Sequence, residues 1–184
     1  MKIPLILGLS LLALTACETE TTNNEPAATP AATAPETPLP AEVSYKGESS
    51  IGSRDNVAVV MNWNKSLAAK DMTAAAALLA DSVEVTLADG TYFNTTRDSL
   101  MKEVSAMIHS FDSIKVDFVA IMPVNVKTDK GTDEWVFSWT DEHFTSAKSK
   151  GHDRVHEDYL IKNGKIAVVY QYTQRPPAKT ASSK

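Results

Sequence analysis

The segment from Gly151 to Ile166 concentrates side chains that could do chemistry. Two histidines, three acidic residues and one arginine lie within its first eight positions. On a helix, His152 and His156 would be neighbours on one face and could ligate a metal together. On a strand they would lie about 13 Å apart at ~3.3 Å per residue, too far for one ion. The secondary structure of this segment therefore decides its chemistry.

The pattern favours a strand. Val155, Glu157, Tyr159 and Ile161 occupy every second position, as on one face of a strand, and the Asn163-Gly164 pair that follows is typical of a tight hairpin turn. We therefore expect no metal site here. The sequence contains no glycine-rich phosphate loop and no metalloprotease or nucleophile-elbow motif, and it implies no cofactor.

A preceding strand would bring further groups beside this one. Trp135, Phe137 and Trp139 alternate with smaller residues. A turn centred near Ser149 would set Asp141 opposite Glu157 and His143 opposite Val155, which joins the odd-numbered faces of the two strands. That face would be aromatic at its deep end and polar at its mouth, as in a ligand pocket.

Two interpretations of this face stay open. In the first, Glu157 is a carboxyl group in a semi-apolar pocket with a raised pKa, and His143 is its proton-transfer partner, with Asp141 beside them. In the second, the tryptophans belong to an ordinary core, and Asp141, His143 and Glu157 form a solvated rim.

Periodicity predicts the fold class. Apolar residues recur at helical spacing from Val57 to Ala68, Asp71 can cap a second helix through Leu79, and Thr95 with Asp98 opens a third. A short strand pair turns at Asp89-Gly90, and after Phe111 the period becomes two, in a meander of long strands. We expect an α+β fold in which three N-terminal helices pack on a curved antiparallel sheet.

A family resemblance rests on nine residues of the predicted helices, strands and closing turn. They are Trp63, Leu67, Asp71, Asp81, Val83, Asn163, Gly164, Lys165 and Ile166. With these residues, the chain resembles the SnoaL-like branch of the nuclear transport factor 2 superfamily over Arg54 to Thr173. That resemblance implies a cone-shaped pocket between helices and sheet, in a family that includes isomerases, dehydratases, cyclases, hydrolases and binding modules.

The resemblance also implies an acidic residue on the strand before the closing turn. Glu157 is the nearest match, although a hairpin one residue longer or shorter would put His156 or Asp158 there. We expect Glu157 and His143 to be the polar groups of the pocket. Its expected lining is Trp63, Tyr92, Phe118, Trp139 and Tyr159.

The first residues resemble the signal of a bacterial lipoprotein. The apolar run from Ile3 to Leu14 is 12 residues long, which is too short for a spanning helix of roughly 20 residues. Leu14-Thr15-Ala16-Cys17 resembles a lipobox and implies that Cys17, the only cysteine, is lipidated, for example with palmitate. Glu18 follows it, and we favour the outer membrane of the bacterial cell envelope over the inner one.

Composition sets the domain boundaries. Residues 1–16 are expected to form the signal peptide, 17–50 the lipidated cysteine and a disordered Pro/Thr/Ala tether, 51–177 the folded domain and 178–184 a disordered tail. The net charge is −5, and the sequence pattern indicates no basic face that would suggest nucleic acid as a partner.

These observations predict a lipoprotein anchored to the membrane through its lipid. Its domain would bind a small apolar ligand or a protein partner in a conical pocket, without evident catalysis. The alternative is an isomerase, dehydratase or hydrolase that uses Glu157 with His143 for acid–base chemistry. We also consider a homodimer that forms through the sheet.

Overall fold

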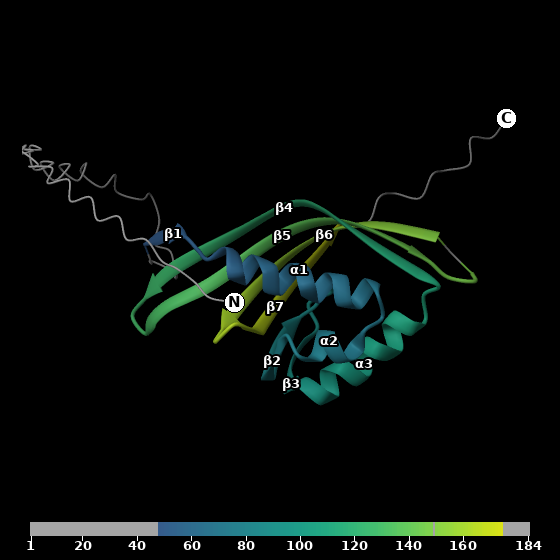
Figure 1. Ribbon diagram of the computed structural model, residues 1–184, viewed down its shortest axis with the longest axis horizontal. Helices are drawn as coiled ribbons and strands as arrows, with labels where there is room; N and C mark the ends of the chain where they lie inside the picture. The colour runs from purple at the N-terminus through teal and green to yellow at the C-terminus, as the bar shows by residue number, and fades with distance from the viewer. Residues whose placement is uncertain (1–47, 149, 175–184) are drawn as a thin grey trace, which may run out of the picture. The chain divides into compact units, whose positions relative to one another are not determined.

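The computed structural model describes residues 48–148 and 150–174 (Figure 1). Cys17, the signal peptide and the predicted tail lie outside these residues, as does most of the predicted tether. Strand β1 (Ser49–Ile51) begins two residues before the predicted domain boundary at residue 51. Within the described ranges, no helix combines the length and apolar character needed to cross a membrane.

Three helices form the layer that covers one face of the sheet. They are α1 (Arg54–Ala68), α2 (Met72–Ala76) and α3 (Arg97–His109). The Asp71 side chain accepts a hydrogen bond from the backbone N–H of Ala74 at 2.9 Å, which confirms its predicted capping role. The helix that it caps is shorter than predicted, because Leu79 already begins the next strand. Thr96, rather than Thr95, caps α3.

The sheet has seven strands in the order β1-β4-β5-β6-β7-β2-β3. Strands β2 and β7 run parallel, so the sheet is mixed and not purely antiparallel as predicted. Asn163 and Gly164 both have positive φ, 53° and 70°, as the tight turn between β6 and β7 requires. The strands after β1 are β2 (Leu79–Thr86), β3 (Tyr92–Thr96), β4 (Ser113–Thr128), β5 (Gly131–Thr145), β6 (Lys150–Lys162) and β7 (Lys165–Gln174).

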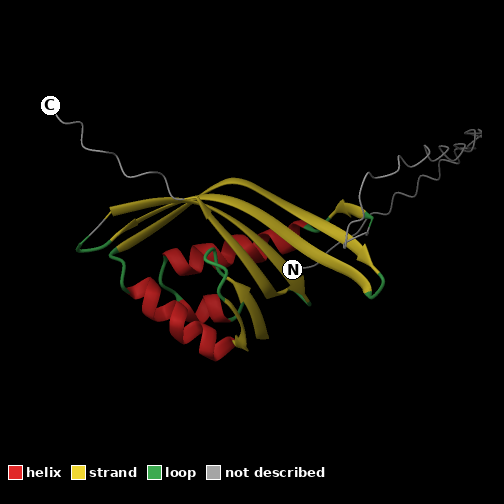
Figure 2. Cartoon of the chain, turned by 180° about the vertical axis from the view of Figure 1, so that it is seen from behind, coloured by secondary structure: helices red, strands yellow, loops and turns green. Residues whose placement is uncertain are grey.

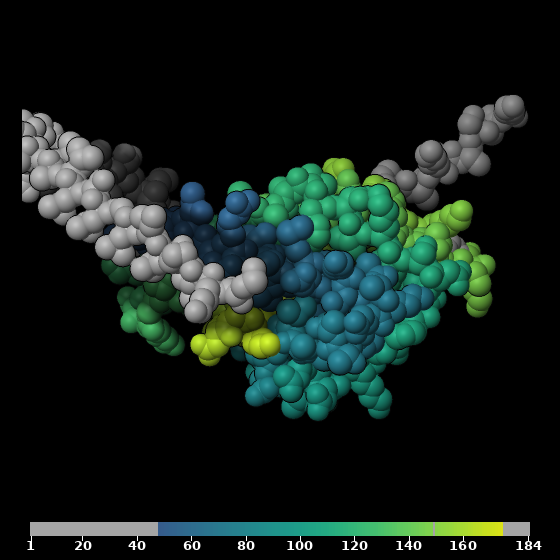
Figure 3. Space-filling view, viewed as in Figure 1, coloured from purple at the N-terminus to yellow at the C-terminus, as the bar shows by residue number. Residues whose placement is uncertain are grey.

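The sheet curves over the helices, which gather on one of its sides (Figures 1 and 2). In the space-filling view, the blue and teal helical segments form much of the surface beneath β4 (Figure 3). We call the side that packs against the helices the inner face and the opposite side the outer face. The core lies at the inner face, and its largest fully buried side chains include Tyr159, Leu79, Ile166, Val60, Val83 and Val136.

The predicted register between β5 and β6 was wrong by three residues. An odd shift exchanges the two faces of a strand, because side chains alternate with a period of two. Glu157 therefore lies on the inner face, whereas Trp139, Asp141 and His143 lie on the outer one. The error arose from the hairpin, which is centred between Ala147 and Lys148 instead of near Ser149. The observed pairs are Ser138 with Glu157, Asp141 with Arg154 and His143 with His152.

A bulge in β4 also changes which residues face the core. The register with β5 shifts between Phe118 and Ala120, so Val119 has no partner on the neighbouring strand. The alternation predicted through Ala120 and Met122 stops there. Ile121 packs against the core instead, and Met122 is 47% exposed.

Candidate functional site

A cavity of about 340 Å³ lies between the helices and the inner face of the sheet. Its walls are mostly apolar, and its polar side chains are Glu103, Glu157 and Gln171. This composition is typical of small-molecule sites. The lining residues are Trp63 and Leu67 of α1, Leu79 and Val85 of β2, Leu87 beyond it, Phe93 of β3, Leu100, Glu103, Val104 and Met107 of α3, Glu157 of β6, and Val169 and Gln171 of β7.

Glu157 is the buried acid of this cavity. Only 8% of the surface of Glu157 is exposed to solvent. The Tyr159 hydroxyl donates a hydrogen bond to its Oε2, and Gln171 Nε2 donates to its Oε1 at 3.2 Å. Burial raises the pKa of Glu157, and these two hydrogen bonds offset that rise only in part. The carboxyl group therefore holds a proton more readily than an exposed glutamate does.

Helix α1 reaches this acid through Tyr159. Asn64 Nδ2 lies 3.4 Å from the Tyr159 hydroxyl oxygen and 3.2 Å from the Val60 carbonyl oxygen, both within hydrogen-bonding distance. Burial, followed by the nearby charge of Glu157, raises the pKa of Tyr159 well above its usual value, so its hydroxyl stays protonated. Asn64 and Tyr159 thus hold the Glu157 side chain in one orientation.

A second acid, Glu142, lies on the same inner face. Burial raises its pKa from 4.5 to about 7, and the charge of Glu157 adds to this rise. The Thr140 hydroxyl donates to Glu142 Oε1 at 3.3 Å and opposes the rise. Glu142 pairs in register with Asp153 of β6, so the inner face carries several carboxyl groups near one another.

Trp63 and Glu157 line the cavity, as the sequence predicted for them. Tyr159 is fully buried and contacts Glu157 directly, although it is not among the lining residues. Sequence reasoning missed Gln171 and Asn64, which complete the hydrogen bonds around this acid. Counting residue pairs back from the Asn163-Gly164 turn would place Tyr170 opposite Glu157. Gln171 lies there instead, because the register shifts by one residue between Leu160 and Ile161.

The predicted partnership of His143 and Asp141 with Glu157 was wrong, because both residues lie on the outer face. Asp141 accepts a hydrogen bond from Arg154 Nε at 3.1 Å. The His143 ring stacks on that of His152, with 4.5 Å between ring centroids. Proton transfer between His143 and Glu157 would have to pass through the sheet, so this pair cannot act together.

Three predicted aromatic lining residues also lie elsewhere. Trp139 is on the outer face, with its ring centroid 4.4 Å from that of His156. Tyr92 is 59% exposed at the edge of the sheet, where its hydroxyl lies 3.5 Å from Glu84 Oε2. Phe118 lines a separate hollow of about 490 Å³ between α1 and β4.

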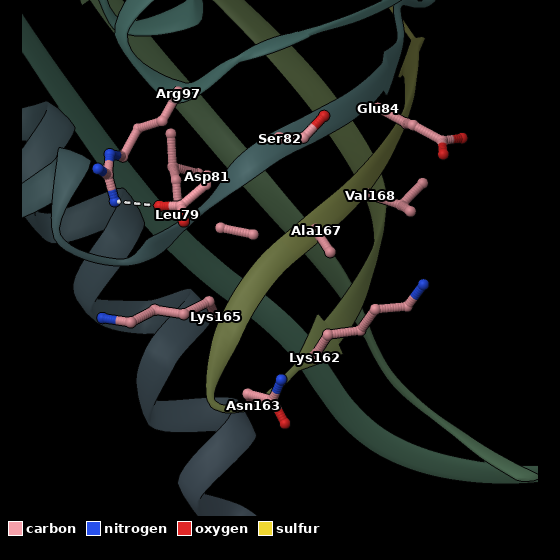
Figure 4. Close-up of a pocket in the computed structure, with 11 residues that line it drawn as sticks. Leu79, Asp81, Ser82, Glu84, Arg97, Lys162, Asn163, Lys165, Ala167 and Val168 are labelled. Carbon is pink, nitrogen blue, oxygen red and sulfur yellow. Dashed lines mark ion pairs between the residues drawn. The ribbon is translucent and has the colours of Figure 1, made fainter.

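A third hollow, of about 550 Å³, lies where β2 and β7 diverge (Figure 4). Its charged groups are of both signs. Arg97 pairs with Asp81 at 3.1 Å, which is the dashed contact in Figure 4, and Lys165 Nζ donates to the Ala77 carbonyl oxygen. Arg97 and Lys165 therefore already have partners, Lys162 is exposed, and no buried acid or base is among the described residues that line this hollow. We take the cavity at Glu157 as the candidate site.

Within residues 48–148 and 150–174, no group of three or more histidine, cysteine, aspartate or glutamate side chains is placed to hold a metal ion. His152 and His156 lie on strand β6, as predicted. His152 Nε2 lies 3.5 Å from an oxygen of Asp141, and His156 Nε2 lies 2.7 Å from an oxygen of Asp158.

We predict that the protein loses stability as pH rises through the range in which its buried acids titrate. Below the ordinary glutamate pKa of 4.5, Glu142 is protonated in both states. Between 4.5 and about 7 the folded protein keeps a proton that the unfolded chain has lost, so the free energy of unfolding falls. For Glu142 alone the loss is on the order of 3 kcal/mol.

Urea unfolding between pH 4.5 and pH 8 measures this dependence. Glu142→Gln should reduce its slope, because this side chain no longer titrates, whereas Glu157 still contributes. Asp98→Asn is the matched control, since its side chain is 95% exposed, and it should leave the dependence unchanged. Equal slopes for Glu142→Gln and the unmodified protein would contradict the prediction.

No protein-family model and no curated protein matches the sequence. Solved structures do match it. An LEH-like epoxide hydrolase from M. tuberculosis has a TM-score of 0.55 at 12% identity, over 66% of this chain and 84% of that one.

A putative ketosteroid isomerase from Kribbella flavida has a TM-score of 0.53 at 10% identity, over 72% and 87% of the two chains. A putative scytalone dehydratase from Novosphingobium aromaticivorans has a TM-score of 0.52 at 17% identity, over 70% and 89%. Likeness at this level of identity shows the fold alone. The described domain thus has the α+β cone of the nuclear transport factor 2-like fold, as its sequence resemblance predicted.

Proposed function

We propose that this domain binds a small, mainly apolar ligand in the cavity at Glu157. The observation that carries the proposal is the combination of an apolar cavity of about 340 Å³ with a buried carboxyl group in its wall. Ligand sites commonly enclose roughly 300–1,000 Å³, so this cavity suits a ligand at the small end of that range. The apolar wall supplies affinity, and Glu157 with Gln171 orients the polar end of the ligand.

Filling the cavity should abolish ligand binding. Val104→Phe places a larger side chain into the space from α3, whereas Met61→Phe makes a similar change in the hollow between α1 and β4. The fluorescence of the neutral dye N-phenyl-1-naphthylamine, displaced by 1-octanol, measures binding. We expect at least about a tenfold loss of affinity for Val104→Phe and little change for Met61→Phe. Equal effects of the two substitutions would rule out this cavity as the site.

A second candidate function is an acid–base enzyme of the isomerase, dehydratase or hydrolase type. Its support is a carboxyl group buried in an apolar wall, where burial raises the pKa of Glu157 above that of an exposed glutamate, as in a general acid or base. This candidate ranks second because His143 lies on the other face and the Tyr159 hydroxyl already donates to Glu157. If the protein is an enzyme, its Glu157→Gln variant should bind the substrate without converting it. If it is a binding protein, neither the unmodified protein nor the variant should convert the ligand.

We further propose that Cys17 carries the lipid that anchors the protein to the bacterial envelope, with the outer membrane favoured. The support is the 12-residue apolar run that stops at Leu14-Thr15-Ala16-Cys17. Intact-mass analysis of the membrane fraction should find a chain that begins at Cys17 with added acyl mass. Cys17→Ser should remove both the processing and the acyl mass. A mature N-terminus elsewhere, without acyl groups, would refute the anchor.

We also propose that the partner of the outer face is a second copy of this chain. Aromatic side chains cross that face without a helix over them in the described part of the chain. Trp135 stacks on Tyr170 at 5.9 Å between centroids, and Trp139 and Tyr172 flank His156. Exposed apolar patches of this kind mark interaction sites, and a two-fold dimer brings the same patch together twice.

Sedimentation of the Cys17→Ser protein tests the dimer. Trp139→Lys should convert it to a monomer, because it places a charge in the centre of the aromatic face. Met61→Lys, on the exposed side of α1, should leave the dimer intact. A monomer before any substitution in the sheet would refute this arrangement.

A further inference from the structure

Glu157 lacks a cationic partner at the cavity. Its hydrogen-bond donors, Tyr159 and Gln171, are both neutral. The cavity lining, as far as the described residues form it, contains no lysine, arginine or histidine. His156 is adjacent in sequence, but it lies on the outer face and pairs with Asp158 at 2.7 Å. Buried carboxylates are normally paired with a cation, so this site is electrostatically incomplete.

The charged groups nearest the cavity are acidic. Glu103 of α3 lines the cavity, and the charge of Glu142 on β5 interacts with that of Glu157. The other elements that approach Glu157 contribute neutral groups, which are Asn64 from α1, Ser138 from β5 and Gln171 from β7. A cleft lined by charges of one sign concentrates ligands of the opposite sign. The cavity therefore favours a cation and disfavours an anion.

The hydrogen-bonding groups at Glu157 favour a donor from the ligand. Both carboxylate oxygens already accept one hydrogen bond, and one of the two N–H groups of Gln171 Nε2 donates to Glu157. The capacity that remains on these two side chains is mostly that of acceptors, on Glu157 and on the Gln171 carbonyl oxygen, with one further N–H of Gln171. An ammonium group has three donors and no acceptor, whereas a carboxylate ligand has no donor.

The walls suit the rest of such a molecule. Trp63 and Phe93 belong to the lining and can hold a cation against their ring faces. Leu100, Val104 and Val169 present an apolar surface to a hydrocarbon chain. We propose that the ligand of this cavity is a lipophilic amine whose ammonium group pairs with Glu157. This inference rests on the ligand-binding function proposed above.

The pairing couples ligand binding to pH. Without a ligand, burial raises the pKa of Glu157, so the carboxyl group takes up a proton at a higher pH than an exposed glutamate does. An ammonium group that pairs with the carboxylate displaces that proton. The affinity for an amine should therefore increase as pH rises through the folded-state pKa of Glu157, until the amine itself loses its proton near pH 10. The affinity for an alcohol should not increase in this way.

Calorimetric titration with three eight-carbon probes tests the inference. The protein is the full-length chain with Cys17→Ser, so that no acyl chain competes for the cavity. Octylamine should bind at least about tenfold more tightly than 1-octanol at pH 7, and octanoate more weakly than both. Titration of octylamine in two buffers of different ionisation enthalpy should show proton release.

Three substitutions locate the effect. Glu157→Gln should abolish the preference for octylamine and retain the affinity for 1-octanol, which also shows that the variant is folded. Asp98→Asn removes one negative charge from a side chain that is 95% exposed and lies outside the cavity lining, and it should change the preference less than about threefold. Val104→Phe should weaken both probes together.

The outcomes separate this inference from the proposed function. If neither 1-octanol nor octylamine binds, the ligand-binding function is wrong and the inference fails with it. If 1-octanol binds as tightly as octylamine, or if Glu157→Gln keeps the preference, the cavity binds ligands but the amine assignment is overturned. Octylamine binding that survives Val104→Phe would place the amine elsewhere and would overturn the assignment as well.

Discussion

The burial of one carboxyl group, Glu157, constrains most of the inner face of this domain. A buried carboxyl group must be hydrogen-bonded, neutralised or paired, because desolvation disfavours its charged form. Here Tyr159 and Gln171 supply the hydrogen bonds, and Asn64 of α1 supports Tyr159. The position of α1 and the registers on both sides of β6 are therefore all needed to satisfy this one group.

The two faces of the sheet have separate chemistry because side chains alternate along each strand. The inner face combines Glu142, Glu157 and Tyr159 with an apolar cavity, and burial raises the pKa of each of these groups. The outer face carries aromatic rings together with His143 and His156, each within 4 Å of an aspartate oxygen. Glu142 and Glu157 are thus kept on the side opposite to the neighbouring His143 and His156, which separates ligand binding from subunit contact in our proposals.

Much of the fold could be predicted from local patterns. The apolar stripe of α1, the capping by Asp71 and the Asn163-Gly164 turn all depend on interactions within a few residues, and all three are present in the structure. The candidate site could be predicted only in part. Trp63 and Glu157 line the cavity, whereas His143 and Trp139, predicted to join them, lie on the outer face.

The sequence by itself determined the helices, the long strands, the turn at Asn163-Gly164 and the acid in β6, because each follows from local spacing and residue type. Only the tertiary structure decided which side chains meet that acid. The hairpin after Thr145 is centred earlier than expected, and register shifts near Val119 and Ala167 each displace a strand relative to its neighbour. A shift of one or three residues changes little in local propensity, yet it moves every side chain that follows to the other face.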